Sequence, residues 1–109
     1  MNKLVLYHVS NPVYRESILK NGLIPQVGES YIMHRGENEI LPPVVFLSIN
    51  NDYDTTWDDD RYEVTLYINK FILKPDLSPH LIDKSFMCHN AIPPACLKLI
   101  HRGTGASTF

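Results

Sequence analysis

The most constraining feature of this sequence is an almost wholly apolar run near its start, Leu-Val-Leu-Tyr-His-Val at positions 4–9. A strand with one solvated face alternates apolar and polar residues, whereas a continuous apolar run is typical of a strand that is covered on both faces. We therefore expect residues 4–9 to form a central strand of a sheet. Its alternation places Leu4, Leu6 and His8 on one face and Val5, Tyr7 and Val9 on the other.

A helix is predicted directly after this strand, because the sequence carries both a start and an end signal. Asn11 can accept a hydrogen bond from a free amide of the first turn, and Pro12 at the first helical position has no amide that would lack a partner. Gly22 adopts the left-handed conformation that ends helices more easily than other residues do. The apolar side chains expected to face the core are Tyr14, Ile18 and Leu19.

Several short strands are expected in the rest of the chain. Residues 44–49 form a second buried-type strand, and residues 61–68 alternate cleanly enough for an amphipathic strand with Val64 and Leu66 pointing inward. Further short strands are expected at residues 85–90 and 96–100. One helix followed by many short strands indicates an α+β fold rather than repeated βαβ units.

The length and composition limit the organisation of the chain. At 109 residues it is long enough for one domain and too short for two, so we expect a single domain over residues 1–101 and a flexible tail over residues 102–109. The apolar runs are far shorter than the ~20 residues of a membrane helix, and no export signal is recognisable, so we expect a cytoplasmic protein without a membrane partner. A net charge of −2 argues against bulk nucleic-acid binding.

Histidines and cysteines are spaced poorly for metal binding. The five histidines show no HxxxH pattern, and the two cysteines form no CxxC pair. Cys88 and His89 are adjacent, and neighbouring strand residues point to opposite faces, so they do not easily share an ion or act together in catalysis. The acidic stretch at residues 52–60 lacks the fixed Gly and distal Glu of a calcium loop. We therefore expect no metal, and reduced thiols at Cys88 and Cys96.

Four short segments carry a resemblance to a known fold. They are Leu-Tyr-His-Val-Ser at residues 6–10, Gly-Leu-Ile-Pro at 22–25, Val-Phe-Leu-Ser at 45–48 and Ala-Ile-Pro-Pro at 91–94. Together, over roughly residues 4–100, they resemble the ADP-ribosyltransferase-like superfamily, and small phage and bacterial domains of its H-Y-E class in particular. The resemblance implies a split antiparallel β-sheet with one N-terminal helix and few short helices.

The resemblance also implies a site for NAD. His8 matches the catalytic histidine that holds the NAD ribose, and Phe46 matches the aromatic residue that stacks on nicotinamide. Trp57 follows Phe46 by eleven residues, the spacing at which that class closes the other face of the ring. Two aromatic faces suit a cationic nicotinamide, and a neutral imidazole can bond ribose hydroxyls. The remaining residues expected to line the cleft are Val9, Ser10, Tyr31, Ser48 and His89.

The sequence departs from the family at its catalytic Glu. Cleavage of the N-glycosidic bond of NAD passes through an oxocarbenium-like state that normally needs a carboxylate near the ribose. Ser85 or Phe86 stands at the matching position, with Asp83 two to three residues away. Either the domain binds NAD or ADP-ribose without turnover, or another group replaces the Glu. A variant of the fold, the RNA 2′-phosphotransferases, manages without the Glu but needs Arg and His partners, for which Arg15 and His8 are the candidates.

The leading expectation is a domain that binds NAD or an ADP-ribosyl nucleotide, with transfer of ADP-ribose to a protein or nucleic-acid acceptor left open. His8 as a hydrogen-bonded core residue and Phe46 as ordinary core are the plainer alternatives. A different class is a non-enzymatic phage or bacterial inhibitor module, whose acidic loop at residues 52–60 engages a basic partner surface.

Overall fold

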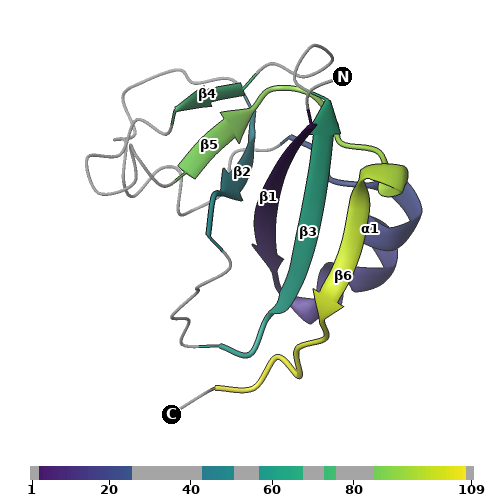
Figure 1. Ribbon diagram of the computed structural model, residues 1–109. Coiled ribbons are helices and arrows are strands. Elements are labelled where there is room, and N and C mark those ends of the chain that lie inside the picture. The colour runs from purple at the N-terminus through teal and green to yellow at the C-terminus, as the bar shows by residue number, and fades with distance from the viewer. Residues whose placement is uncertain (1–2, 26–42, 51–56, 68–72, 76–84, 108–109) are drawn as a thin grey trace.

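The computed structural model describes residues 3–25, 43–50, 57–67, 73–75 and 85–107 (Figure 1). The first strand is followed by a short helical region, and the remaining elements are mostly strands. In chain order they are β1 (Lys3–Ser10), the 3₁₀ turn η1 (Pro12–Tyr14), α1 (Arg15–Asn21), β2 (Val45–Ser48), β3 (Asp60–Tyr67), β4 (Leu73–Pro75), β5 (Ser85–Cys88), the 3₁₀ turn η2 (Pro94–Cys96) and β6 (Leu97–His101).

The strands form one antiparallel sheet in the order β4-β5-β2-β1-β3-β6. The predicted α+β class is confirmed by this sheet and its one short helix, and β1 is central as expected. The predicted strands at residues 44–49, 61–68, 85–90 and 96–100 correspond to β2, β3, β5 and β6, each within two residues at either end. Strand β4 was not predicted.

The sheet consists of two blocks that meet between β1 and β2. Strand β1 pairs with β3 through eight residue pairs, from Lys3↔Tyr67 to Ser10↔Asp60. In contrast, among the described residues β1 and β2 share the single registered pair Tyr7↔Ser48. We call β1, β3, β6 and α1 the inner block and β2, β5 and β4 the outer block. Figure 1 shows the two blocks diverging at the β1–β2 junction.

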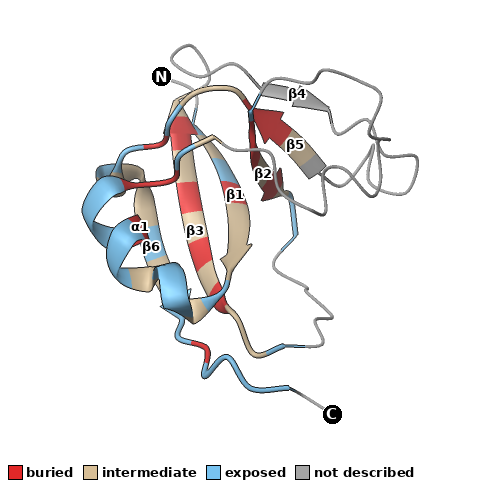
Figure 2. Cartoon of the chain, turned by 180° about the vertical axis from the view of Figure 1, so that it is seen from behind, coloured by how far each residue is buried: buried red, intermediate tan, exposed pale blue. Residues whose placement is uncertain are grey.

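The core lies between the sheet and α1. On β3, alternate residues from Asp60 to Leu66 are buried and the residues between them are partly exposed, which confirms the predicted amphipathic strand (Figure 2). Each fully buried aliphatic side chain contributes about 1.5–3 kcal/mol. The main cluster joins both blocks and includes Leu6, Ile18, Leu47, Val64 and Ile92.

Two expectations about burial were wrong. Tyr14 and Leu19 are 58% and 45% exposed, because α1 has only seven residues and presents Ile18 alone to the core. Val5 is 44% exposed, so the second face of β1 is not covered along its whole length. The apolar run therefore correctly predicted a central strand, but it did not predict correctly that both faces of this strand are buried.

The two ends of the helical region follow their sequence signals. The Asn11 side chain accepts a hydrogen bond from the Val13 amide at 3.0 Å, and Pro12 opens the 3₁₀ turn that precedes α1. Gly22 ends α1 with φ +82°, and a Cβ at this position would lie 2.0 Å from the Ile92 carbonyl oxygen. Both the backbone angle and the close approach therefore require glycine. No helix among the described residues has the length and apolar character needed to cross a membrane.

The segment after β6 lies against the start of β3. Gly103 is buried, and its amide donates to the Asp60 carboxylate at 2.8 Å. The Gly105 amide donates to the Asp58 carbonyl at 2.9 Å. These contacts join residues 102–107 to the inner block, whereas the sequence predicts that the domain ends at residue 101. The flexibility predicted for the tail stays a prediction.

Candidate functional site

His8 lies at the junction of the two blocks, one residue beyond the Tyr7↔Ser48 pair. Its Nδ1 is 2.8 Å from the carbonyl oxygen of Phe46. Because a carbonyl oxygen only accepts, Nδ1 carries the proton in this bond and Nε2 is left as the lone-pair acceptor of the neutral ring. Burial lowers the pKa of His8 below its ordinary value of 6.5, although the bond to Phe46 acts in the opposite direction. The imidazole is therefore neutral at pH 7.

The surroundings of His8 on its other side come from β3. Tyr62, its cross-strand partner, has its ring centroid 6.5 Å from that of His8, with the planes inclined by 44°. Burial raises the pKa of Tyr62, and the nearby charge of Asp60 raises it further, so the phenol keeps its proton. His8 is thus held between an aromatic ring of the inner block and a main-chain carbonyl of the outer block.

The structure joins His8 to Phe46 through the main chain of Phe46. Leu47 is 1% exposed and packs in the main cluster with Leu6, on the face that His8 shares by alternation. The Phe46 side chain instead packs against Val44 and Met87, which form a separate small cluster. The phenyl ring and the imidazole therefore leave the sheet on opposite faces, and the stacking role of Phe46 stays a prediction.

The other expected cleft residues on β1 and β2 lie close to the junction. Val9 and Ser10 follow His8 and are partly exposed. The Ser48 hydroxyl donates to the Asn50 carbonyl at 3.1 Å and lies 3.3 Å from the Asn50 amide, so it stabilises the end of β2.

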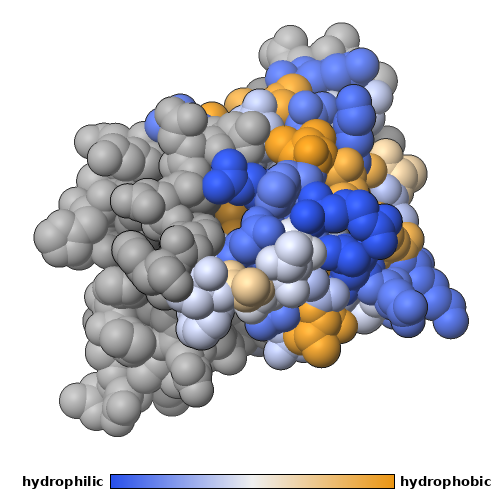
Figure 3. Space-filling view, turned by 90° about the horizontal axis from the view of Figure 1, so that it is seen from below, coloured by the Kyte–Doolittle hydropathy of each residue, from blue (hydrophilic) through white to orange (hydrophobic). Residues whose placement is uncertain are grey.

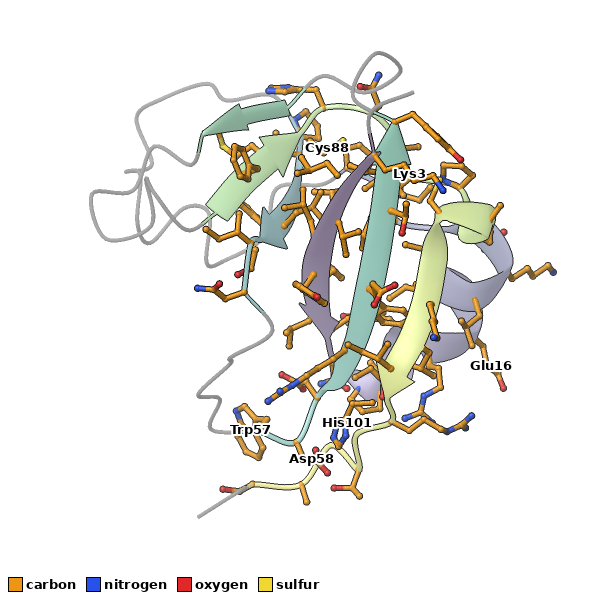
Figure 4. The ribbon with its side chains drawn as sticks, viewed as in Figure 1. Lys3, Glu16, Trp57, Asp58, Cys88 and His101 are labelled. Carbon is orange, nitrogen blue, oxygen red and sulfur yellow. The ribbon has the colours of Figure 1, made fainter. Side chains whose placement is uncertain are left out.

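Trp57 lies at the end of the molecule where β3 begins, next to the labelled Asp58 and His101 side chains (Figure 4). Its side chain is 53% exposed, and its main chain pairs with Ser107.

Two further predictions concern the outer block. His89 is partly exposed, but its Nε2 atom is buried without a hydrogen-bond partner among the described residues. Ser85, at the position that resembles the missing Glu, pairs in register with Ser48. Tyr31 and Asp83 lie outside the described residues. His89 follows β5 and Trp57 precedes β3, whereas His8 lies on β1.

Sequence reasoning missed a charged network at the start of β3. Asp60 is fully buried, and Arg15 binds its carboxylate with two hydrogen bonds, from Nε at 2.8 Å and from Nη2 at 2.6 Å. Burial alone would raise the pKa of Asp60, but the bonds from Arg15 and Gly103 and the charge of Arg15 lower it. The signal was present, because Asp60 extends the inward alternation of Tyr62, Val64 and Leu66 by one position.

This network also bears on Arg15 as a candidate partner of His8 in a phosphotransferase-type site. Its guanidinium is engaged by the Asp60 carboxylate and by the Gly103 carbonyl, which accepts from Nη2 at 2.8 Å. A phosphotransferase site of that kind would require Arg15 to act together with His8. Arg15 is instead bonded to Asp60 and Gly103.

The described residues contain no group of three or more His, Cys, Asp or Glu arranged to hold a metal ion. No family model, curated protein or solved structure matches this chain.

Proposed function

We propose that this chain is an ADP-ribosyltransferase-like domain that binds NAD or an ADP-ribosyl nucleotide at the junction of the two blocks. The observation that carries the proposal is the state of His8, whose Nδ1 is bound to the Phe46 carbonyl at 2.8 Å. Its ring is neutral, and no described residue donates a hydrogen bond to Nε2. An acceptor of this kind suits a ribose hydroxyl, which donates readily.

The sheet supports the same proposal. The resemblance implies a split antiparallel sheet, and the presence of one registered pair between β1 and β2 among the described residues supports that part of the proposal. His8 is located at this junction, and on its other side it belongs to the continuous ladder between β1 and β3 as the partner of Tyr62. The Phe46 bond fixes the orientation of the ring, so little conformational freedom remains to be lost when a ligand binds.

Binding without turnover is the form of the proposal that the described residues favour. Transfer would break the bond between ribose C1′ and nicotinamide, which leaves with the bonding electrons, while an acceptor nucleophile bonds C1′ and loses a proton. On the face of β3 that carries Tyr62, the partner of His8, the next carboxylate along the strand is Asp60, and it is engaged by Arg15 and Gly103. Glu63 pairs with Tyr7 and lies on the opposite face of the strand. Transfer to a protein or nucleic-acid acceptor therefore requires a carboxylate from elsewhere, for which Asp83 is the candidate.

The alternative function, an inhibitor module that binds a basic partner through residues 52–60, is less well supported than the sequence suggests. Asp58 accepts hydrogen bonds from Thr104 and contacts His101 at 2.7 Å, and Asp60 is buried with Arg15. These two carboxylates are engaged by groups of the same chain. The acidic stretch therefore offers a basic surface fewer charges than its sequence indicates.

Two substitutions of His8 test the proposal by calorimetric titration with NAD. In His8→Asn, the side-chain amide can still donate to the Phe46 carbonyl from the position of Nδ1, but nothing replaces Nε2. In His8→Gln, the longer side chain places an acceptor near the position of Nε2. We expect the parent chain to bind NAD, His8→Asn to lose binding while it keeps the parent melting temperature, and His8→Gln to retain part of the affinity.

The exposed Lys98 on β6 supplies the matched control, and Lys98→Ala is expected to bind like the parent chain. Mass spectrometry of the same mixtures for free nicotinamide separates turnover from binding. A parent chain that shows no heat of binding at millimolar NAD and releases no nicotinamide would overturn the proposed function.

A further inference from the structure

The segment at residues 103–107, which we call the C-terminal clasp, runs beside residues 57–60 and is bonded to their main chain. The Asp58 amide donates to the Ala106 carbonyl at 2.8 Å, and the Gly105 amide donates to the Asp58 carbonyl at 2.9 Å. Trp57 itself pairs with Ser107. The residue that carries the indole therefore pairs with the clasp, and the residue after it is hydrogen-bonded to the clasp through both its amide and its carbonyl.

Side chains reinforce this attachment. One oxygen of the Asp58 carboxylate is 2.7 Å from Nε2 of His101, and the other accepts from the amide and the hydroxyl of Thr104, both at 3.1 Å. The bond to His101, followed by those to Thr104, lowers the pKa of Asp58. This carboxylate therefore stays charged to a lower pH than an ordinary aspartate.

The fit between the clasp and β3 is close enough to demand glycine at position 103. A Cβ there would lie 2.1 Å from the Asp58 carbonyl oxygen and 2.5 Å from the Asp59 carbonyl carbon. Both neighbours are backbone atoms, which cannot turn away as a flexible side chain can. A larger residue at position 103 would therefore push the clasp away from residues 58–59.

From these contacts we infer that the C-terminal clasp fixes the position of Trp57 and that release of the clasp frees the indole. The clasp lies at the end of the molecule that carries Trp57, Asp58 and His101 (Figure 4). Seen from below, the described surface is largely hydrophilic, with scattered hydrophobic residues (Figure 3). A consequence for the nucleotide site rests on the proposed function. If the Trp57 indole covers the bound nicotinamide, the clasp regulates nucleotide binding by holding or releasing that indole.

The experiment uses fluorescence of the full chain, because Trp57 is its only tryptophan. We expect Gly103→Ala to raise the acrylamide quenching constant and to lower the anisotropy of Trp57, with the far-ultraviolet circular dichroism unchanged. Gly105→Ala is the matched control, because the nearest atoms to its Cβ belong to Pro12 at 3.9 Å. Its φ of +77° makes alanine strained there as well, but without a backbone clash, so its effect is expected to be smaller.

Thr104→Val provides a second, milder variant, because it removes the hydroxyl donor to Asp58 and keeps the amide. It is expected to shift quenching and anisotropy in the same direction, even if Gly103→Ala fails to fold. Unchanged quenching and anisotropy in the folded variants would overturn the inference.

The same proteins are then titrated with NAD. Loss of one aromatic face is expected to weaken binding by about tenfold in Gly103→Ala. If the parent chain binds no NAD, the proposed function fails, while the fluorescence alone still decides whether the clasp holds Trp57. If Trp57 is loosened and the affinity is unchanged, the clasp stands but its control of the site is refuted.

Discussion

The inner and outer blocks of the sheet differ in how firmly each is specified. In the inner block, eight pairs join β1 to β3, and the buried alternation from Asp60 to Leu66 fixes the face that each residue presents. Among the described residues, the outer block is joined to β1 by one registered pair, by the bond between His8 and the Phe46 carbonyl, and by packing in the main cluster. A functional group placed at such a junction can respond to a ligand without disturbing the better specified part of the core.

The largest expected effect comes from the charged network of the inner block. Asp60→Ala removes the buried carboxylate that accepts from Arg15 and from the Gly103 amide, and losing hydrogen bonds to such a charged group costs about 1.5–3 kcal/mol of unfolding free energy. Urea denaturation followed by circular dichroism measures the loss. Asp59→Asn is the matched control, because burial, and then the charges of Asp58 and Asp60, raise the pKa of Asp59, so removing its charge should not destabilise the protein. A similar loss in both variants would contradict the special role of Asp60.

A smaller effect is expected in the relative stability of the two blocks. Amides of β2 and β5 should exchange with solvent at opening free energies at least about 1 kcal/mol below those of β1 and β3, because fewer cross-strand contacts resist local opening. Native-state hydrogen exchange of the full chain measures both sets in one sample. Equal opening free energies would show that the sheet opens as a single unit, and the distinction between the blocks would then be structural only.

The smallest expected effect is the pH dependence of the unfolding free energy that His8 contributes. The pKa of His8 is lowered from 6.5 in the folded state, so below pH 6.5 the unfolded state takes up the proton first. The unfolding free energy therefore falls as the pH drops from 6.5 toward the folded pKa, by at most about 1.4 kcal/mol per pH unit. The contributions of Asp58 and Asp60, whose pKa values are lowered, are lost only below pH 3.8.

The two pH windows separate the contribution of His8 from those of Asp58 and Asp60. Subtracting the pH profile of His8→Asn from that of the parent chain isolates the contribution of His8, because all other titrating groups are common to both. A difference profile that is flat between pH 6.5 and 3.8 would mean that the His8 pKa is not lowered in the folded protein.

Local signals in the sequence were sufficient for much of the inner block. The helix signals at Asn11 and Gly22 act within one turn, and the alternation of β3 is visible in the sequence, so both were predictable. The exposure of Tyr14 was not predictable, because it depends on how short α1 is and on how the helical region rests on the sheet. The proximity of Gly103 to Asp58 depends on residues that are far apart in sequence, for which no local pattern exists.

The candidate site shows the same limit. His8 was singled out from the sequence, and the structure gives its ring a fixed partner in the Phe46 carbonyl. Side-chain periodicity could not have predicted this bond, because the acceptor is a main-chain atom on a strand that diverges from β1. The same divergence explains why a spacing rule that joins Phe46 to Trp57 does not determine the faces on which their rings lie.

The contacts of Arg15 also bear on the order of folding. This guanidinium joins Asp60, which is 45 residues away in the sequence, and the Gly103 carbonyl, which is 88 residues away. Closing loops of this size is entropically unfavourable, so such contacts generally form after the local turns and hairpins. Bonds that are absent from the folding transition state slow unfolding and hardly alter the folding rate. The buried ion pair therefore prolongs the lifetime of the native protein more than it helps the chain to reach it.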